Sequence, residues 1–387
     1  FPDLGKRLLP LRPLALQQVH AADSVLGTWA AGSPKGLTVA SYADLVRKAF
    51  RREWWQSLSV VRYDGMESAA EMAERRRLAA SNGLANLDNP NSAGKFALPL
   101  EEYTQMEANF SLFFGLAIQM YEATLVSNDA PIDRYSEGNA TALTAIQKQG
   151  MALFHGKARC DACHGGPVFT AAANLNLPAD PAAQEAAVEL SHLGLPQRVG
   201  IYDNGFYNIG VRPIREDLGL GANDPFGYPL AEARLLKYGL EKKAALTGRK
   251  DFFFVFPTDT FEGDGFFKSP TLRNVELTAP YFHNGGTLTL EQVVEFYNRG
   301  GDFNENGHNP AVRPLGLTAA ERDALVQFLK SLTDDRVRYD RAPFDHPQLR
   351  IPNGVTASAN GTLTEQWIEL PAVGAAGNAE ARRNFLQ

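Results

Sequence analysis

The sequence predicts a mostly α-helical protein whose helices are interrupted by a long, loop-rich stretch. Apolar residues recur at helical spacing in several segments, and N-capping residues precede some of these segments. Residues 165–285 are instead dense in Gly, Pro, Asn, Asp and Phe. At 387 residues the chain can form two domains, or one large domain, with a buried core. We therefore divide it by texture into residues 1–135, 136–340 and 341–387.

The first region is expected to be helical. Residues 41–55 begin with Ser41, a good N-cap, and carry apolar residues at helical spacing. Residues 68–83 are typical of a charged surface helix that ends at Gly83. Residues 100–127 predict a long, mostly buried helix, because the window FSLFFGLAIQM within this segment is largely apolar.

The second region begins with a helix over residues 141–156 and closes with two more, over 289–300 and 317–332. Thr318 and Glu321 have the spacing of a capping box at the start of the last helix. The loop-rich stretch of residues 165–285, between the first of these helices and the last two, offers few periodic apolar faces. We therefore expect it to wrap around something. The third region is punctuated by Pro, Gly and Asn and predicts surface loops and short strands.

Composition and charge exclude several classes of protein. The net charge of −6 and the pI of about 5.7 do not favour a nucleic-acid partner, which would require a basic face. The most hydrophobic window, FSLFFGLAIQM, has the length of a buried helix and is too short to span a bilayer. The chain has 44% hydrophobic and 21% charged residues, as ordinary globular proteins do.

Both cysteines of the chain lie in one short motif, Cys160-Asp-Ala-Cys163-His164. Cys-x-x-Cys-His is typical of covalent c-type haem attachment. Two thiols on one turn can reach the two vinyl groups of a haem, and the adjacent histidine can bind the iron. A disulfide or a thioredoxin-like redox pair is the alternative, although a turn rather than a helix follows the motif. A structural zinc site would need further ligands of suitable spacing.

Covalent haem c would also indicate the compartment, because this group is attached outside the bacterial cytoplasm; we therefore expect a periplasmic protein. A small cytochrome with a methionine ligand after the haem motif is excluded, since no Met follows Cys163. Met151, on the helix that approaches the motif, is expected to pack in the core.

A longer segment further along the chain resembles a known family. Residues 266–301, FFKSPTLRNVELTAPYFHNGGTLTLEQVVEFYNRGG, are similar to the C-terminal haem domain of bacterial di-haem cytochrome c peroxidases and the related enzyme MauG. The resemblance covers most of residues 100–345. It implies a cytochrome c-like haem domain with long loop-rich insertions, preceded by a helical linking region. It also implies an oxidoreductase that uses hydrogen peroxide and an electron donor, which can be a protein.

The resemblance also assigns roles to individual residues. Tyr297 stands where peroxidases of the family have a distal Met ligand and MauG-like members a Tyr; a helix-end aromatic in the core is the alternative. A phenolate ligand would favour oxidised iron and lower the reduction potential. Backbone carbonyls of Thr278 and Pro280 match a calcium loop, in which hard oxygen ligands suit the ion. His283 is expected either to order the haem surroundings or to serve as a structural residue.

Two further predictions concern the haem and its electrons. Arg273 is a candidate partner of a haem propionate, since its guanidinium group can grip a carboxylate with two hydrogen bonds. Trp54 and Trp55 could relay electrons between haems, although a Trp pair in an amphipathic helix more often belongs to the core.

The chain departs from the family pattern because it has one haem motif where the family has two. Residues 1–135 contain no cysteine and cannot attach haem c. We therefore expect the C-terminal part of a di-haem protein, with the second haem on a missing part or on a companion polypeptide. The alternatives are a mono-haem electron-transfer module and a di-haem oxygenase of the rubber-cleaving type.

Overall fold

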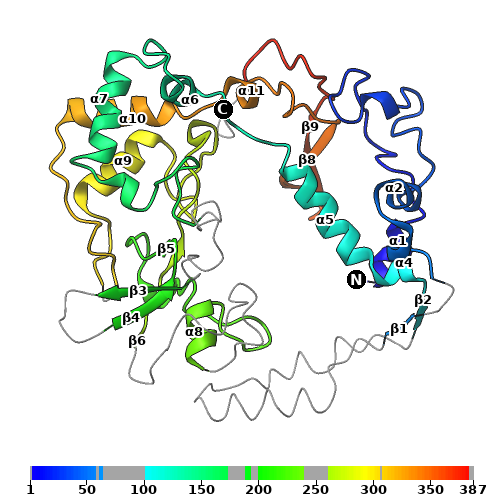
Figure 1. Cartoon of the computed structure of the whole chain (residues 1–387), viewed down its shortest axis with the longest axis horizontal. Coiled ribbons are helices and arrows are strands. Elements are labelled where there is room, and N and C mark those ends of the chain that lie inside the picture. Colours follow the sequence, from blue (N-terminus) through cyan, green and yellow to red (C-terminus); the bar gives the residue numbers. More distant parts are fainter. Residues whose placement is uncertain are drawn as a thin grey trace. The chain divides into compact units, whose positions relative to one another are not determined.

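The chain folds as two compact units in a computed structural model that describes residues 2–57, 61–63, 101–172, 188–192, 199–238, 260–305 and 307–382 (Figure 1). The units interleave along the sequence. The first unit contains Phe1–Gly65, Leu98–Asp133 and Asp334–Arg383, and the second contains Met66–Ala97, Arg134–Thr333 and Asn384–Gln387. Helix α6 (Pro131–Ser136) spans the point at which the chain passes from the first unit to the second.

The described part of the first unit combines short helices with two pairs of antiparallel strands. Its helical segments are α1 (Pro2–Leu8), η1 (Gly27–Trp29), α2 (Tyr42–Ala49), η2 (Arg52–Trp54), α4 (Gln105–Ala108), α5 (Phe110–Glu122) and α11 (Asp335–Arg338). Its strands are β1 (Val61–Tyr63) antiparallel to β2 (Glu101–Tyr103), and β8 (Leu349–Ala357) antiparallel to β9 (Leu363–Leu370).

The core of the first unit forms where α1, α2, α4 and α5 meet. Its buried members are Leu9, Met106, Phe110 and Phe113, with Phe50 and other half-buried side chains packed against them. The predicted N-cap at the start of α2 is confirmed, because the side chain of Ser41 accepts a hydrogen bond from the backbone N–H of Asp44. The predicted helix over 68–83 lies outside the described residues.

The prediction of one long, mostly buried helix over residues 100–127 is wrong. Strand β2 and helix α4 occupy the first part of this segment, and α5 begins at Phe110. Only Phe110 and Phe113 of α5 are buried. The helix is apolar around its circumference, but only its first turns meet the core of the unit. Among the described residues, no helix is long and apolar enough to cross a bilayer.

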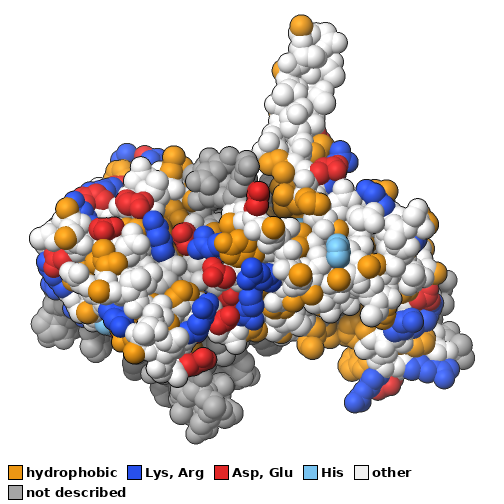
Figure 2. Space-filling view, turned by 90° about the horizontal axis from the view of Figure 1, so that it is seen from above, with side chains coloured by type: hydrophobic (Ala, Val, Ile, Leu, Met, Phe, Trp, Pro, Cys, Tyr) orange, Lys and Arg blue, Asp and Glu red, His pale blue; other side chains and the backbone are white. Residues whose placement is uncertain are grey.

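The tail of the chain contains a long hairpin, with strands of nine and eight residues, where the sequence predicts short strands. In Figure 2 a narrow column projects from the surface at the position of β8 and β9, and almost every residue of the two strands is exposed. Their register runs from Leu349 opposite Leu370 to Ala357 opposite Leu363, with an irregularity between Pro352 and Val355.

The second unit contains the helices that flank the cysteine motif. Its described helical segments are α7 (Ala145–His155), η3 (Cys160–Ala162), η5 (Ile214–Glu216), α8 (Glu232–Lys237), η6 (Val275–Leu277), α9 (Leu290–Arg299) and α10 (Ala319–Lys330). Capping boxes begin α7, α9 and α10, and the one at Thr318 and Glu321 confirms the prediction for the last helix.

Helices α7 and α10 pack closely against each other (Figure 1). Gly150 allows this approach, because a Cβ atom at that position would lie 1.9 Å from the carbonyl oxygen of Ala324. Phe154 and Phe328 extend the contact, with their ring centroids 5.2 Å apart. Because α10 also packs against α9, the three helices make one support for the loops around them.

Within its described residues the loop-rich stretch contributes short strands besides the helical segments η5, α8 and η6. A three-stranded sheet has the order β3 (Val188–His192), β4 (Val199–Asp203), β6 (Thr260–Phe261), and a second sheet pairs β5 (Phe206–Tyr207) with β7 (Phe267–Lys268). Strand β3 is antiparallel and β6 parallel to β4. Strand β7 leads directly into the segment that reaches the cysteine motif.

Candidate haem-binding site

The cysteine motif forms a tight turn after the end of α7. Arg159 adopts a left-handed conformation with φ of 50°, and η3 then begins at Cys160. The backbone N–H groups of Cys163 and His164 both donate to the carbonyl oxygen of Cys160. One turn therefore holds the two thiols and the imidazole close together, as covalent haem attachment requires.

The two cysteines are half-buried and are not joined in a disulfide. Burial raises the pKa of the Cys160 thiol to about 12, and the nearby Asp161 and Cys163 act in the same direction. Redox-active cysteines work as thiolates and sit in surroundings that lower their pKa. The surroundings of Cys160 therefore disfavour the thioredoxin-like interpretation and suit a thiol that serves as an attachment point.

The imidazole of His164 is oriented by backbone carbonyl groups. Its Nδ1 lies 3.2 Å from the carbonyl oxygens of both Phe169 and Pro270. Burial lowers the pKa of His164, which favours the neutral ring. A neutral ring that donates its Nδ1–H to a carbonyl carries its lone pair on Nε2, and metal-binding histidines use this arrangement. His164 is thus prepared to bind a metal through Nε2.

Beside these groups lies a cavity of about 580 Å³, within the size range of ligand pockets. Its wall includes Cys160, Cys163 and His164, and Tyr297 also lines it. Apolar side chains from α7, α9 and α10 complete much of the lining, among them Phe154, Val293, Val294, Leu325 and Leu329. The loop-rich stretch wraps around this cavity through residues such as Tyr207 and Phe267. Together, the two thiols, the oriented imidazole and the largely apolar cavity fit a haem c.

Tyr297 projects into the cavity from the last turn of α9. Phe282 and Phe296 surround its ring, with centroid distances of 6.3 and 5.3 Å. Burial raises the pKa of Tyr297 well above its usual value, and the two nearby thiols would raise it further if ionised. The phenol is therefore neutral in the chain alone, and a metal ion would have to displace its proton to bind it.

His283 lines the same cavity and has two close partners. Its Nε2 lies 2.6 Å from Oδ2 of Asp217, and its ring stacks on Phe267 with a centroid distance of 3.5 Å. The sequence analysis missed Asp217 and Phe267, because 66 residues separate Asp217 from the histidine and neither has a recognisable motif. The predicted ordering role of His283 is compatible with this arrangement and stays a prediction.

The predicted calcium residues, Thr278 and Pro280, also line the cavity. The hydroxyl of Thr278 donates to the carbonyl oxygen of Val275, 3.1 Å away. Among the described residues, no group of three or more His, Cys, Asp or Glu side chains is placed to hold a metal ion. The calcium prediction concerns backbone carbonyl groups and is not tested by that observation.

The remaining predicted residues lie in different surroundings. Arg273 lines the cavity, but its Nε donates to the carbonyl oxygen of Pro167 at 2.9 Å, and its guanidinium lies 5.8 Å from the centroid of the Phe169 ring. Trp54 and Trp55 belong to the first unit. Trp55 packs against the core there and donates from Nε1 to the carbonyl oxygen of Phe50, whereas Trp54 is half exposed. Their relay role stays a prediction.

Comparisons with known proteins point to one family. No protein-family model matches the chain. It is 32% identical over 235 residues to the cytochrome-c peroxidase IdrP2 of Denitromonas iodatirespirans, covering 61% of this chain and 52% of that protein. It is 33% identical over 219 residues to IdrP1 of Pseudomonas sp. (strain SCT), covering 56% and 48%. The methylamine utilization protein MauG of Methylorubrum extorquens is 28% identical over 216 residues, covering 56% and 42%.

Solved structures of the same kind were also found. A MauG-like protein associated with microbial copper homeostasis is 24% identical, with a TM-score of 0.36 and coverage of 72% of this chain and 65% of that one. The diheme peroxidase BthA of Burkholderia thailandensis is 22% identical, with a TM-score of 0.35 and coverage of 72% and 62%.

The chain spans about half the length of the curated relatives that it matches. These relatives are named as cytochrome-c peroxidases or as MauG, and the match was expected from the segment around Tyr297. Over more than half of its length the chain is similar to bacterial cytochrome-c peroxidases and to MauG.

Proposed function

We propose that this chain is the haem c-bearing C-terminal part of a periplasmic, MauG-like di-haem peroxidase. In this proposal a haem ligated by His164 and Tyr297 relays or stores oxidising equivalents. One observation carries the proposal: the two thiols, the oriented imidazole and the phenol of Tyr297 line a single cavity of about 580 Å³. The relatives named as peroxidases support the reaction class, with hydrogen peroxide and an electron donor as partners.

Each side chain has a separate task in this proposal. Cys160 and Cys163 form thioether bonds to the haem, and His164 binds the iron through Nε2. The bound haem supplies one-electron redox chemistry. Tyr297 would bind as a phenolate, whose negative charge stabilises the oxidised metal and lowers its reduction potential. The apolar wall excludes water, which strengthens the effect of that charge.

The one haem motif accounts for one haem, so the second haem of a complete enzyme would be held by another domain or by a companion polypeptide. Carbonyl groups of Thr278 and Pro280 would contribute to a calcium site, with further ligands from that second part. His283, fixed by Asp217 and Phe267, would order the edge of the haem site.

Haem counting combined with native mass spectrometry tests the proposal. Pyridine haemochrome spectra should give one haem c per chain of 42.3 kDa. A particle with two haems and a second polypeptide would support the di-haem enzyme, and peroxide turnover is then the next assay. A chain purified from a host competent in haem c attachment that carries no haem would overturn the proposal.

The ligand role of Tyr297 has its own test. Replacement by Phe removes the oxygen but keeps the ring, so the absorption and electron paramagnetic resonance spectra should change from those of a six-coordinate to those of a five-coordinate or water-ligated ferric haem. Tyr339→Phe, in the first unit, is the matched control and should leave the spectra unchanged. Identical spectra for Tyr297→Phe and the unmodified protein would exclude phenolate ligation.

A mono-haem electron-transfer module is the second candidate, because the chain has a single Cys-x-x-Cys-His motif. One haem in a lone chain, with a spectrum that does not respond to peroxide, would favour it. Two haems in the particle would exclude it.

A further inference from the structure

Residues 163–170, which follow the first cysteine of the motif, are called the haem loop here. Three side chains fasten this loop to a segment about a hundred residues further along the chain. The hydroxyl of Ser269 donates to the carbonyl oxygen of Cys163 at 2.8 Å, and that of Thr271 donates to Val168. Nε of Arg273 donates to the carbonyl oxygen of Pro167. We call Ser269, Thr271 and Arg273 the clamp. Alternate residues of the sequence SPTLR thus supply donors to the same short loop.

The clamp brackets the carbonyl group that orients His164. Pro270 lies between Ser269 and Thr271, and its carbonyl oxygen is 3.2 Å from Nδ1 of His164. The second acceptor near Nδ1, the carbonyl oxygen of Phe169, belongs to the haem loop itself. The position of one acceptor is therefore local, whereas that of the other depends on how the two segments are held together.

The fastening also works in the reverse direction. Thr170, at the end of the haem loop, donates from its hydroxyl to the carbonyl oxygen of Ser269. Thr170 and Ser269 are both buried, at 5% and 6% exposure, so water does not compete strongly for these hydrogen bonds. The hydroxyl of Ser269 is also 3.4 Å from Nδ1 of His164, which places the clamp directly beside the imidazole.

We propose that Ser269 and Thr271, supported by Arg273, are positioning residues that set the strength of the hydrogen bond from His164 Nδ1 to Pro270, and through it the reduction potential of the haem. The inference rests on the proposed function, in which His164 binds the iron. A hydrogen bond donated from Nδ1 makes Nε2 more basic and stabilises the oxidised metal. Loosening the clamp would therefore weaken that bond and raise the reduction potential.

This inference gives Arg273 a different task from the propionate contact that its residue type suggests. A propionate partner would present its guanidinium to the ligand, whereas Nε is engaged with a backbone carbonyl of the haem loop. The side chain also covers the ring of Phe169, whose carbonyl is the other acceptor of His164. Arg273 thus supports both acceptors from outside.

The local surroundings allow mild substitutions. In Ser269→Ala the carbonyl of Cys163 keeps a partner, because it also accepts from the backbone N–H of Ala171. In Thr271→Val the exposed position lets water reach the carbonyl of Val168. Neither change leaves a buried unpaired group, so both variants should fold and attach haem.

The experiment is a spectroelectrochemical titration of the haem-loaded chain. Ser269→Ala, Thr271→Val and the double variant should raise the midpoint potential, so that the ratio of reduced to oxidised haem at a fixed potential rises by about threefold to tenfold. A tenfold change corresponds to about 59 mV for a one-electron couple. Thr124→Val is the matched control, since it also removes a hydroxyl-to-carbonyl hydrogen bond but lies in the first unit; its potential should not change.

A conservative variant separates positioning from simple fastening. Thr271→Ser keeps the hydroxyl and should restore the original potential, whereas a role limited to holding the loop would alter the melting temperature and leave the potential unchanged. Equal potentials for the double variant and Thr124→Val, at full haem content, would overturn the inference alone. An unmodified chain without haem would overturn the proposed function, and the inference with it.

Discussion

Two buried polar arrangements, the haem pocket of the second unit and the contacts of Asp334 in the first, use their side chains in opposite ways. In the pocket the hydrogen bonds of His164 to other described residues involve Nδ1, and both thiols line a cavity. Asp334 is completely buried, and both of its carboxylate oxygens accept hydrogen bonds from neighbouring groups. Reactive side chains that line a cavity indicate a binding or catalytic site, whereas buried polar groups whose hydrogen bonds are satisfied indicate a structural role.

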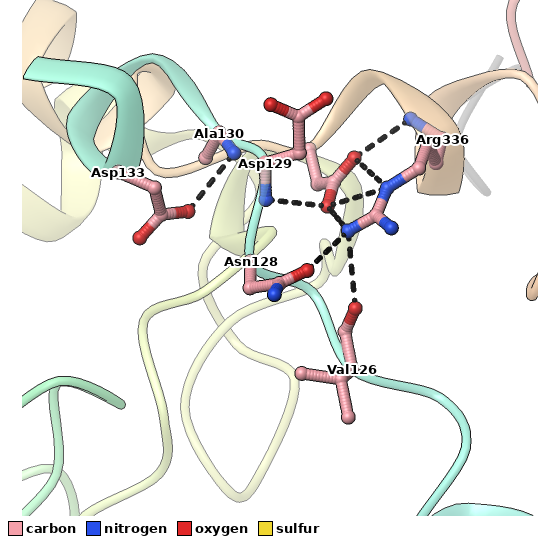
Figure 3. Close-up of polar contacts among 7 residues, drawn as sticks. Val126, Asn128, Asp129, Ala130, Asp133 and Arg336 are labelled. Atoms are coloured by element: carbon pink, nitrogen blue, oxygen red, sulfur yellow. Dashed lines mark hydrogen bonds and ion pairs between the residues drawn. The ribbon is translucent and has the colours of Figure 1, made fainter. Parts of the chain in front are cut away.

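The carboxylate of Asp334 accepts from the backbone N–H of Asp129 and pairs with Arg336. The guanidinium of Arg336 also reaches Val126 and Asn128 (Figure 3). Burial alone would raise the pKa of Asp334, but the hydrogen bonds and charge of Arg336 outweigh it and lower the pKa. The carboxylate is therefore ionised and joins α11 to the segment that follows α5.

The first prediction concerns the two thiols in the pocket of the second unit. Replacing both Cys160 and Cys163 by Ser keeps the shape of the loop but removes the thiols, so covalent haem should be lost completely. Extraction with acidified acetone followed by a pyridine haemochrome assay measures this. Each single Ser variant should keep haem through the remaining thioether. Covalent haem in the double variant would show that another residue carries the attachment.

The second prediction concerns the ion pair between Asp334 and Arg336 in the first unit. Asp334→Asn removes the charge that pairs with the guanidinium of Arg336, which is 28% exposed, and the loss of these charge-assisted hydrogen bonds costs about 1.5–3 kcal/mol of unfolding free energy. Chemical denaturation followed by fluorescence measures the change, while the haem spectrum should stay as it is.

Asp335→Asn is the matched control for that change. Its carboxylate is 56% exposed and pairs with Arg338 at the surface, so the loss should stay below about 1 kcal/mol. Equal stability losses for the two variants would contradict a structural role for Asp334.

The third prediction tests the support under the pocket. Gly150→Ala would place a methyl group against the backbone of Ala324 and force α7 and α10 apart, at a cost of about 1–3 kcal/mol. Gly115→Ala in α5 is the matched control, because no atom lies near that position. That variant should stabilise its helix by up to about 1 kcal/mol. A neutral Gly150→Ala would mean that the two helices can separate without loss.

Much of the pocket was predictable because its chemistry is carried by neighbouring residues in the sequence. The motif of Cys160, Cys163 and His164 is local, and Tyr297 was placed by resemblance; the structure brings all four to one cavity. The acceptors of His164 could not be predicted, because they are backbone carbonyl groups, one of them 106 residues away. Backbone groups have no signature in a sequence.

Helix α5 shows the opposite limit. Its composition predicts burial, because an apolar circumference normally requires cover on every side. Only Phe110 and Phe113 are buried, since the core of the unit reaches just the first turns of the helix. Hydrophobicity indicates that a face needs a partner, but it does not say which part of a chain supplies one. Helix beginnings were easier, as at Ser41 and Thr318, because capping depends on residues three positions apart.

The last prediction concerns a buried histidine of the first unit. His346 is buried, with Nε2 3.9 Å from Oδ2 of Asp340, and Arg382 and Asn378 hold the same carboxylate. The Asp340 carboxylate raises the pKa of His346 above its usual value, although burial and the charge of Arg382 oppose this. Because the folded pKa is raised, the charged imidazole stabilises the fold below the unfolded pKa of about 6.5, and this contribution is lost as the pH rises through the folded pKa.

His346→Gln should therefore destabilise the first unit more at pH 5.5 than at pH 8.5, as measured by thermal unfolding at each pH. His155→Gln is the control, because that side chain is 53% exposed and its pair with Asp161 should contribute little at either pH. A difference for His346→Gln that is constant or grows with pH would contradict the ion pair. It would mean that neutral contacts alone hold the imidazole of His346 in place. The predicted pH dependence would instead show that His346, like His164 in the pocket, has a ring nitrogen whose hydrogen-bonding capacity the surrounding residues only partly use.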